Sequence, residues 1–507
     1  MSEVKIVQKE NAFDKILSAV NQTVDLIKPT FGPASNKIVI SKLTHAMVVD
    51  DGVQAARDLQ LEDPVENAIM KVVRETAIKT NDRVGDGTTG ALIMLQAIIK
   101  QVAKSTHIDG RKIENELKEA FKTCEEQLKA QAKPVTTQEE LYKIALVSFD
   151  NKEIAKLISE AWFELGTDGV LTVDRSGTME TVTELTKGIK IEHGYISPYM
   201  ITNPQRMEAV IEKPHILYTD YRLTEANDVI HVMNKLADQK ITNLVIIAEN
   251  VEGSALATIT INKMQGKFNA VAINAPKGDN RTTALEDMAL MTGGKVFSEG
   301  KGDKLEEVEL TDLGRADRFI AKRTESVIIG PRGNKENIQK YIADLLEAKD
   351  TESSERDKQS LKERVARFSE KIGVIKVGAP TENEVNALRY KIEDAVNATH
   401  AAFKGGVVSG AGLALANLKT ESKIFNEALK APFHQLKVNV NLDEHRELQE
   451  GEAINVVTGD IGPWQEIGVM DPVDVLIAQL ESAVSIAGLL VTTSGMIVEE
   501  PEHLKQE

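Results

Sequence analysis

Residues 81–95 read Asn81-Asp-Arg-Val-Gly-Asp-Gly-Thr-Thr-Gly90 and then Ala91-Leu-Ile-Met-Leu95, so a glycine-rich segment runs directly into an apolar one. The three glycines allow the backbone to turn tightly and to approach a ligand. The hydroxyls of the two threonines lie where a helix would begin, and the unsatisfied N–H groups at such a helix start attract anions. The segment therefore has the features of a phosphate-binding site.

Asp86 lies in the middle of this segment. A carboxylate repels a phosphate, so we expect its partner to be a hard cation such as Mg²⁺, which bridges carboxylate and phosphate oxygens. The segment thus indicates magnesium–nucleotide chemistry. A simpler interpretation is a glycine-rich turn in which an aspartate caps a core helix, and this segment alone does not decide between the two.

Five other segments, far apart in the chain, contain glycine turns, acidic residues or both. They read Thr30-Phe-Gly-Pro33, Val48-Val-Asp-Asp-Gly52, Tyr390-Lys-Ile-Glu-Asp-Ala395, Gly405-Gly-Val-Val-Ser-Gly-Ala-Gly412 and Val469-Met-Asp-Pro472. Together, and in this order, they resemble the group I chaperonins of the bacterial GroEL type. The resemblance runs from about Lys5 to about Val498, and further stretches support it: Gly194-Tyr-Ile-Ser-Pro-Tyr199, Ile246-Ile-Ala-Glu-Asn-Val-Glu-Gly253, Met291-Thr-Gly-Gly294 and Ile375-Lys-Val-Gly378.

Composition agrees with this resemblance and excludes other classes. A chain of 507 residues is long enough for roughly three domains, each with its own core. The net charge of −17 argues against nucleic-acid binding, which needs a basic surface. The single cysteine, Cys124, fits a reducing cytosol and is expected to be a small buried group. No stretch of about 18 uncharged apolar residues and no N-terminal apolar leader is present, so we expect a soluble, cytoplasmic protein without a membrane partner.

The resemblance implies a multidomain fold of the α plus α/β class, the chaperonin fold. A mostly helical equatorial domain that binds ATP would be built from residues 1–131 and 405–507. A hinge, or intermediate, domain would be built from residues 132–186 and 373–404. An inserted α/β apical domain, which binds polypeptide, would span residues 187–372.

Hydrophobic periodicity predicts the main elements. Helices are expected at 11–27, 65–80, 90–104, 113–130, 254–264, 283–292, 383–404 and 473–487, and a charged helical pair at 336–371. Strands are expected at 169–173, 243–248, 270–273 and 327–329.

The resemblance also implies roles for individual residues. Asp86 would hold Mg²⁺ against the phosphates, Asp51 would be a second acidic group near the metal, and Asp394 would orient the attacking water. These three are the candidate catalytic residues, because phosphoryl transfer needs charge neutralisation and a positioned nucleophile. The candidate nucleotide-binding set is Thr30, Phe31, Gly32, Pro33, Asp51, Asp86, Gly87, Thr88, Thr89, Gly90, Ser148, Gly410, Ala411, Asn455, Val456, Val469 and Asp471.

Several positions depart from the family pattern. Gly90 stands where a third threonine is usual, Ala411 replaces the middle glycine of a triplet, and Val456 replaces a small residue beside the base. Asp50 stands where a lysine is expected, and an added carboxylate beside a triphosphate should weaken nucleotide attraction. We therefore expect nucleotide binding to be retained and turnover to be weak.

Capture of non-native polypeptide would need exposed apolar side chains in the apical segment. The residues at matching positions are Tyr195, Tyr199, Met200, Leu256 and Ile261. Ordinary core packing is the alternative role for these side chains. His231, Asn234 and Thr260 are polar where the family has aliphatic residues, so the range of clients stays open.

The sequence therefore predicts an ATP-dependent chaperone and ATPase that captures non-native polypeptides in a ring cavity, with ATP and Mg²⁺ as cofactors. Its partners would be further copies of the same chain, in a heptameric ring by family resemblance, and a GroES-type co-chaperonin. The alternative is a ring-forming holdase that binds unfolded polypeptide with weak or no ATP hydrolysis.

Overall fold

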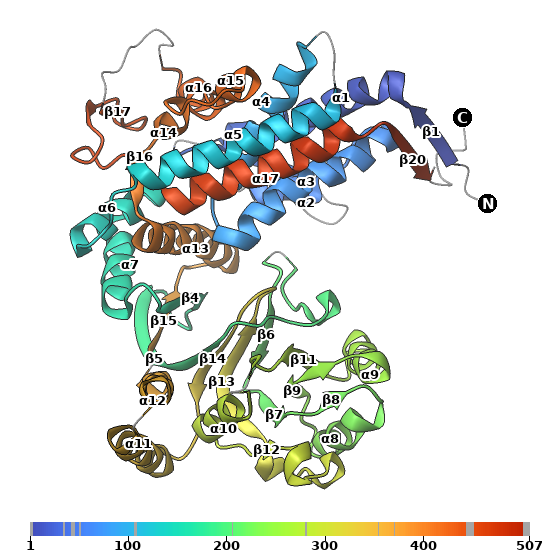
Figure 1. The fold of residues 1–507 in the computed structure, drawn as a ribbon, viewed down its shortest axis with the longest axis vertical. Helices are drawn as coiled ribbons and strands as arrows, with labels where there is room; N and C mark the ends of the chain where they lie inside the picture. The colour runs from blue at the N-terminus through green and yellow to red at the C-terminus, as the bar shows by residue number, and fades with distance from the viewer. Residues whose placement is uncertain are drawn as a thin grey trace. The chain divides into compact units, whose positions relative to one another are not determined.

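The computed structural model describes residues 4–33, 36–41, 46–49, 52–105, 109–204, 206–278, 281–352, 354–369, 371–442 and 451–499 (Figure 1). The chain divides into two compact units. Unit 1 consists of Met1–Thr167, Val173–Val182 and Ile375–Glu507, and unit 2 consists of Asp168–Thr172 and Thr183–Val374. The chain therefore enters and leaves unit 2 from within unit 1.

Unit 1 is mostly helical. Its helices are α1 (Lys9–Ile27), α2 (Gly52–Asp58), α3 (Pro64–Val84), α4 (Thr88–Ala103), α5 (Gly110–Gln131), α6 (Gln138–Ser148), α7 (Lys152–Leu165), α13 (Glu382–Gly405), α14 (Leu413–Ala416), α15 (Lys423–Ala428), α16 (Ala431–Asn439) and α17 (Val473–Thr492), with a 3-10 turn η1 (Lys28–Thr30). Short antiparallel pairs join β1 (Val4–Gln8) to β20 (Gly495–Glu499), β2 (Ile38–Ser41) to β3 (Ala46–Val49), β16 (Val407–Ser409) to β19 (Met470–Pro472) and β17 (Glu452–Ile454) to β18 (Ile461–Pro463).

Helix α17 is the centre of the unit 1 core. It packs against α3, α4 and α5, and Figure 1 shows it running alongside α5. By length and composition alone α17 could cross a membrane, but 78% of its apolar window is buried inside the fold. Small residues permit this close packing: a Cβ added to Gly488 would lie 3.0 Å from Cγ of Glu114 on α5. The apolar character of α17 is thus explained by its place in the core.

Unit 2 contains a mixed sheet that, within the described residues, has the strand order β11-β9-β7-β13-β14-β5 and continues through β15 and β4, where the chain passes between the units. Strands β7, β9, β11 and β12 are parallel, whereas β13 pairs antiparallel with β6, β7 and β14. The bounds are β4 (Val170–Arg175), β5 (Val182–Ile191), β6 (Ala209–Glu212), β7 (His215–Thr219), β8 (Arg222–Leu223), β9 (Asn243–Ala248), β10 (Asn250–Val251), β11 (Asn269–Asn274), β12 (Val296–Phe297), β13 (Gly314–Ala321), β14 (Ser326–Pro331) and β15 (Lys371–Val377).

The parallel strands are buried on both faces, which explains their continuous apolar sequences. Leu244 to Ala248 in β9 are fully enclosed. The helices of this unit are α8 (Asn227–Asp238), α9 (Gly253–Met264), α10 (Arg281–Thr292), α11 (Lys335–Thr351) and α12 (Glu355–Ser369), with 3-10 turns η2 (Pro198–Met200), η3 (Glu299–Lys301), η4 (Leu305–Glu307) and η5 (Leu310–Asp312).

The structure confirms the α plus α/β class and the type of each predicted helix and strand. Several helices begin or end at other residues than predicted. Helix α3 continues to Val84, because Gly85 supplies the left-handed residue that ends it (φ 69°). Helix α4 begins at Thr88 and not at Gly90, and α17 continues to Thr492. The limits of unit 2 lie close to the predicted apical segment, 187–372, while the predicted equatorial and intermediate segments fall largely together in unit 1. Their separation into two domains stays a prediction.

Candidate functional site

The glycine-rich segment forms a tight loop between α3 and α4. Gly85 and Gly87 both have left-handed backbones, with φ of 69° and 79°. Gly87 is the N-cap residue of α4 and provides no side-chain cap. Asp86 lies between them, and one of its carboxylate oxygens accepts a hydrogen bond from the Gly87 N–H at 2.5 Å. The simpler interpretation, in which Asp86 is the cap of α4, is therefore wrong, and the first turn of α4 has no side-chain cap to satisfy its N–H groups.

The threonine hydroxyls gather on the side of the loop that faces α1 and α2. Thr88 and Thr89 are 7% and 8% exposed. The Thr30 hydroxyl, at the end of α1, lies 3.4 Å from that of Thr89 and donates to the Ile27 carbonyl at 2.8 Å. A Cβ on Gly52 would lie 2.1 Å from the Thr89 hydroxyl, so the start of α2 closely approaches the same point. The structure thus brings two distant predicted segments, 30–33 and 48–52, to the start of α4.

Residues 30–33 form a tight turn that begins at the end of η1. Phe31 N–H donates to the Lys28 carbonyl at 3.1 Å, and Gly32 has φ of 94°. A Cβ at Gly32 would lie 2.3 Å from Leu436 on α16, so a larger residue would displace this helix. Pro33 is exposed at the end of the described turn.

Helix α13, which contains Asp394, contacts the loop of residues 85–87 through Asn397. Three residues further along this helix, the Asn397 side-chain amide donates to the Gly85 carbonyl at 3.4 Å. Residues three apart share one face of a helix, so Asp394 lies one turn from this contact. Asn397 was not among the residues predicted from sequence, and only its contact with Gly85 in the structure identifies it.

The turn between β16 and α14 also lies near this loop, because it contacts Asp471, whose carboxyl group interacts with that of Asp86. The Gly410 N–H donates to the Val469 carbonyl at 2.9 Å, and the Gly412 N–H donates to the Asp471 carboxylate at 3.3 Å. Ala411 has φ of 57°, a left-handed conformation that a side chain makes unfavourable. The left-handed backbone explains why the family pattern has glycine at position 411, and the alanine found here adopts this conformation under strain.

A small cluster connects this turn with the β17–β18 hairpin. Leu413, Ala453 and Val469 are its buried members, and Ala411 packs against it. Asn455 lies in the hairpin loop, where its side-chain oxygen accepts from the N–H groups of Val457 and Thr458 at 3.0 and 3.2 Å. Its amide NH₂ is therefore the end that remains for a ligand. Val456 is half-buried beside it.

Asp471 is the most perturbed carboxyl of this region. Burial and, to a smaller extent, the negative charge of Asp86 together raise its pKa to about 6, against the opposing effect of the Gly412 N–H. The carboxylates of Asp86 and Asp471 thus repel each other. A bound cation would relieve this repulsion, so the residues present fit Mg²⁺ held with a phosphate.

In the part of the chain that the structure describes, no group of three or more histidine, cysteine, aspartate or glutamate side chains is arranged to hold a metal ion. Mg²⁺ would therefore be held by Asp86 with phosphate and water oxygens, as this ion prefers. Asp50 and Asp51 lie outside the described residues. Ser148 is exposed at the end of α6, and its assignment stays a prediction.

The predicted polypeptide-binding side chains divide into two groups. Tyr199 and Ile261 are 66% and 51% exposed, and Leu256 is half-buried. The expected exposure is wrong for Met200, which is fully buried, and for Tyr195, which is 8% exposed. Met200 packs under the sheet, where its sulfur accepts the Ala272 N–H at 3.2 Å, and Tyr195 forms a β-bridge with Ile273.

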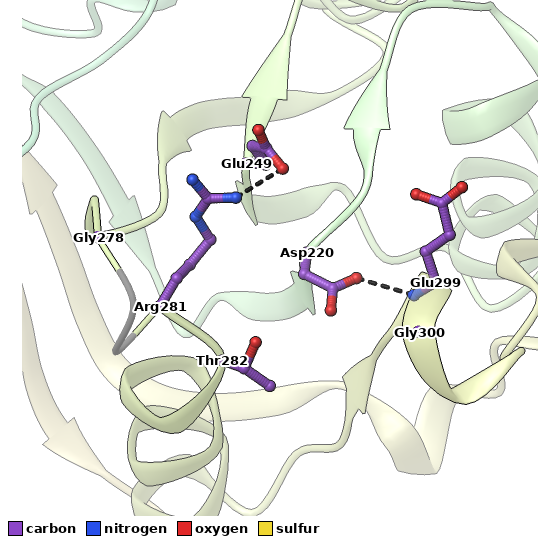
Figure 2. A pocket seen from close by; sticks show the side chains of 7 residues that line it. All are labelled: Asp220, Glu249, Gly278, Arg281, Thr282, Glu299 and Gly300. Atoms are coloured by element: carbon purple, nitrogen blue, oxygen red, sulfur yellow. Dashed lines mark hydrogen bonds and ion pairs between the residues drawn. The ribbon is translucent and has the colours of Figure 1, made fainter.

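A pocket of about 490 Å³ lies in unit 2 at the carboxyl ends of the parallel strands (Figure 2). Asp220 follows β7 and Glu249 follows β9, an edge at which many α/β folds bind ligands. Arg281 forms an ion pair with Glu249 at 2.6 Å, and Asp220 accepts a hydrogen bond from the backbone N–H of Glu299 at 2.8 Å, as Figure 2 shows. We assign no ligand to this pocket.

The family model of the TCP-1/cpn60 chaperonin family matches residues 24–501. Two crystal structures of the chaperonin gp146 from the bacteriophage EL 2 (Pseudomonas aeruginosa), both in the presence of ATP-BeFx, are similar to this chain at 20% sequence identity. In each case the match covers 98% of this chain and 99% of the other, with TM-scores of 0.68 for crystal form II and 0.62 for crystal form I. The structural likeness supports the chaperonin fold, and the family match extends over nearly the whole sequence. The chain therefore belongs to the TCP-1/cpn60 chaperonin family, as a divergent member.

Proposed function

We propose that this chain is an ATP-dependent chaperone that hydrolyses ATP with Mg²⁺ and uses the resulting conformational cycle to capture and release non-native polypeptides. The observation that carries this proposal is that α4 and α13 meet at the loop that contains Asp86. The start of α4 has no side-chain cap and follows Asp86 directly, and α13 contacts the same loop through the hydrogen bond between Asn397 and Gly85. A phage chaperonin of similar fold was crystallised in the presence of ATP-BeFx, which supports ATP as the ligand of this chain.

Each residue contributes a defined part of the chemistry. The N–H groups and the hydroxyls of Thr88 and Thr89 bind phosphate oxygens at the start of α4. Mg²⁺, when bound, neutralises phosphate charge, and Asp86 holds it. Asp394 accepts a proton from a water molecule and orients it, which contributes in the transition state more than in binding. Asn397 fixes the approach of α13, so movement of this helix would change the position of Asp394 relative to the loop.

Polypeptide capture is assigned to exposed apolar side chains in unit 2. Tyr199 and Ile261 are exposed, and Met264 is 69% exposed one turn after Ile261 on α9. Helix α9 packs against η2, which carries Tyr199, so these side chains come from neighbouring elements. Exposed apolar groups select unfolded chains, which expose apolar surface of their own.

The remaining parts of the proposal follow family resemblance. The protein would work in the cytoplasm as a homo-oligomeric ring, heptameric by that resemblance, and with a GroES-type co-chaperonin. The second candidate function is a ring-forming holdase with weak or no hydrolysis. Strain at Ala411 and the mutual repulsion of Asp86 and Asp471 favour it, because both affect the nucleotide site.

Phosphate release by the purified protein, measured with Mg-ATP, tests the proposal. We expect Asp86→Ala to abolish release, and Asp394→Ala to slow it by a factor of at least about 100 while ADP affinity stays near the wild-type value. Glu393→Ala is the matched control, since it removes the adjacent carboxylate of α13. Wild-type rates in Asp86→Ala would show that the site is wrongly assigned. Nucleotide binding without phosphate release by the wild-type protein would favour the holdase.

A further inference from the structure

Gln479 is a polar side chain in the middle of the apolar core helix α17. It is 6% exposed, and the residues on either side of it, Ala478 and Leu480, are apolar and fully buried. Burying a carboxamide without hydrogen bonds is unfavourable, so such a residue normally has partners. The position of this side chain therefore needs an explanation.

The carboxamide packs directly against the phosphate loop. Its Nε2 atom lies 2.4 Å from the point that a Cβ on Gly87 would occupy, and 2.8 Å from the corresponding point on Gly90. Its Oε1 atom is also 2.8 Å from the Gly90 point. Any larger residue at either position would displace the amide. Gly90 lies inside α4, so its lack of a side chain serves this contact and not a turn.

Among the described residues the Gln479 amide forms no hydrogen bond, and it is not one of the fully enclosed unpaired side-chain atoms, so it stays accessible beside the loop; the other buried glutamine of the same helix pair is bonded within the protein. On α4, Gln96 donates to Asn21 and Asp25 at 3.0 and 2.9 Å. The unpaired Gln479 amide and the uncapped first turn of α4 thus lie together at one point. Both present N–H donors, and an anion would satisfy both.

We infer that Gln479 is a further nucleotide-binding residue, whose Nε2–H donates a hydrogen bond to a phosphate oxygen held at the start of α4. This inference rests on the proposed nucleotide site. The amide occupies the space in which a side chain at position 90 would lie, and it supplies from α17 a donor that Gly90 itself lacks. Gln479 on α17 would thus provide the hydrogen-bond donor that a side chain at position 90 of α4 would otherwise provide.

Binding of ADP in the presence of Mg²⁺ to the assembled full-length protein, measured by isothermal titration calorimetry, tests this inference. Gln479→Met keeps the length of the side chain and removes both donors. We expect its ADP dissociation constant to rise about tenfold or more, because a hydrogen bond to a charged group is lost. In the double variant Gln479→Ala with Gly90→Thr, a hydroxyl is supplied from α4 into the vacated space, and affinity should return to within about threefold of wild type.

The control is Gln96→Ala, which removes a buried glutamine already bonded within the protein. It should lower thermal stability without changing ADP affinity. Wild-type ADP affinity in Gln479→Met would overturn the inference and leave Gln479 as a packing residue, while the nucleotide site itself would stand. Failure of the wild-type protein to bind ADP would overturn the site and this inference together, so the two failures are distinguishable. If Gln479→Met does not fold, unrestored affinity in the double variant is the overturning result.

Discussion

Replacing Asp471 with asparagine should stabilise the nucleotide-free protein at neutral pH. Two effects raise the pKa of this carboxyl group from 3.8 to about 6: burial, which is the larger, and the negative charge of Asp86. Its hydrogen bond from the Gly412 N–H can be accepted equally by the asparagine oxygen. The substitution therefore removes the ionisation while retaining the contact.

The sign and size follow from proton linkage. Because the pKa of Asp471 is higher in the folded than in the unfolded chain, the folded state binds more protons between about pH 4 and pH 6, and stability falls as the pH rises through this range. A difference of about two pKa units corresponds to about 3 kcal/mol at pH 7 and to almost nothing at pH 4. For a unit of this size we expect Asp471→Asn to raise the unfolding temperature by roughly 5 °C at pH 7, with a smaller gain at pH 5.

Differential scanning fluorimetry of both proteins from pH 4.5 to 7.5, without nucleotide, measures this effect. Asp474→Asn is the matched control, because it makes the same change three residues later, in the first turn of α17. That carboxylate interacts favourably with the α17 dipole, so its loss should lower stability by a few tenths of a kcal/mol. A difference between Asp471→Asn and wild type that does not vary with pH would refute the reasoning.

Three further outcomes are expected. Ala411→Gly should raise the unfolding temperature slightly, by the equivalent of about 0.5–1 kcal/mol, because relief of the left-handed strain exceeds the added flexibility of the unfolded chain; an unchanged or lower value in the same fluorimetry assay would contradict it. Tyr199→Glu should reduce protection of a diluted denatured protein from aggregation, measured by light scattering, without lowering phosphate release, whereas unfolding of the variant would place Tyr199 in the core. Cys124 is fully buried and burial raises its pKa to about 12, so it should react with a thiol reagent such as Ellman's only after denaturation, and rapid reaction of the native protein would argue against this position.

The positions of the elements were largely predictable from the sequence, because the apolar period of each long helix is local information. Helices α1, α3, α5 and α13 lie within a few residues of their predicted ranges. The family resemblance was predictable for a related reason. Its motifs are short runs of glycine, aspartate and threonine in which the backbone itself determines the residue type, as the positive φ values of Gly85 and Gly87 illustrate.

The exposure of the apical side chains could not be read from the sequence. Tyr199 and Met200 are neighbours in one 3-10 turn, yet the first is 66% exposed and the second fully buried. Both are large and apolar, so composition does not separate them. Met200 contacts Ala272 of β11, which lies 72 residues further along the chain, and only that packing decides which side chain points inward.

The sequence by itself determined the nature of the loop: a turn that needs glycine, an aspartate fit for a hard cation, and hydroxyls at a helix start. Tertiary structure decided what surrounds it. Asn397 and Gln479 carry no local signal, since an amide on a helix is usually a solvated residue. They meet the loop because α13 and α17 pack beside it after long excursions of the chain, and side-chain contacts of this kind depend on distances in space that the order of residues does not contain.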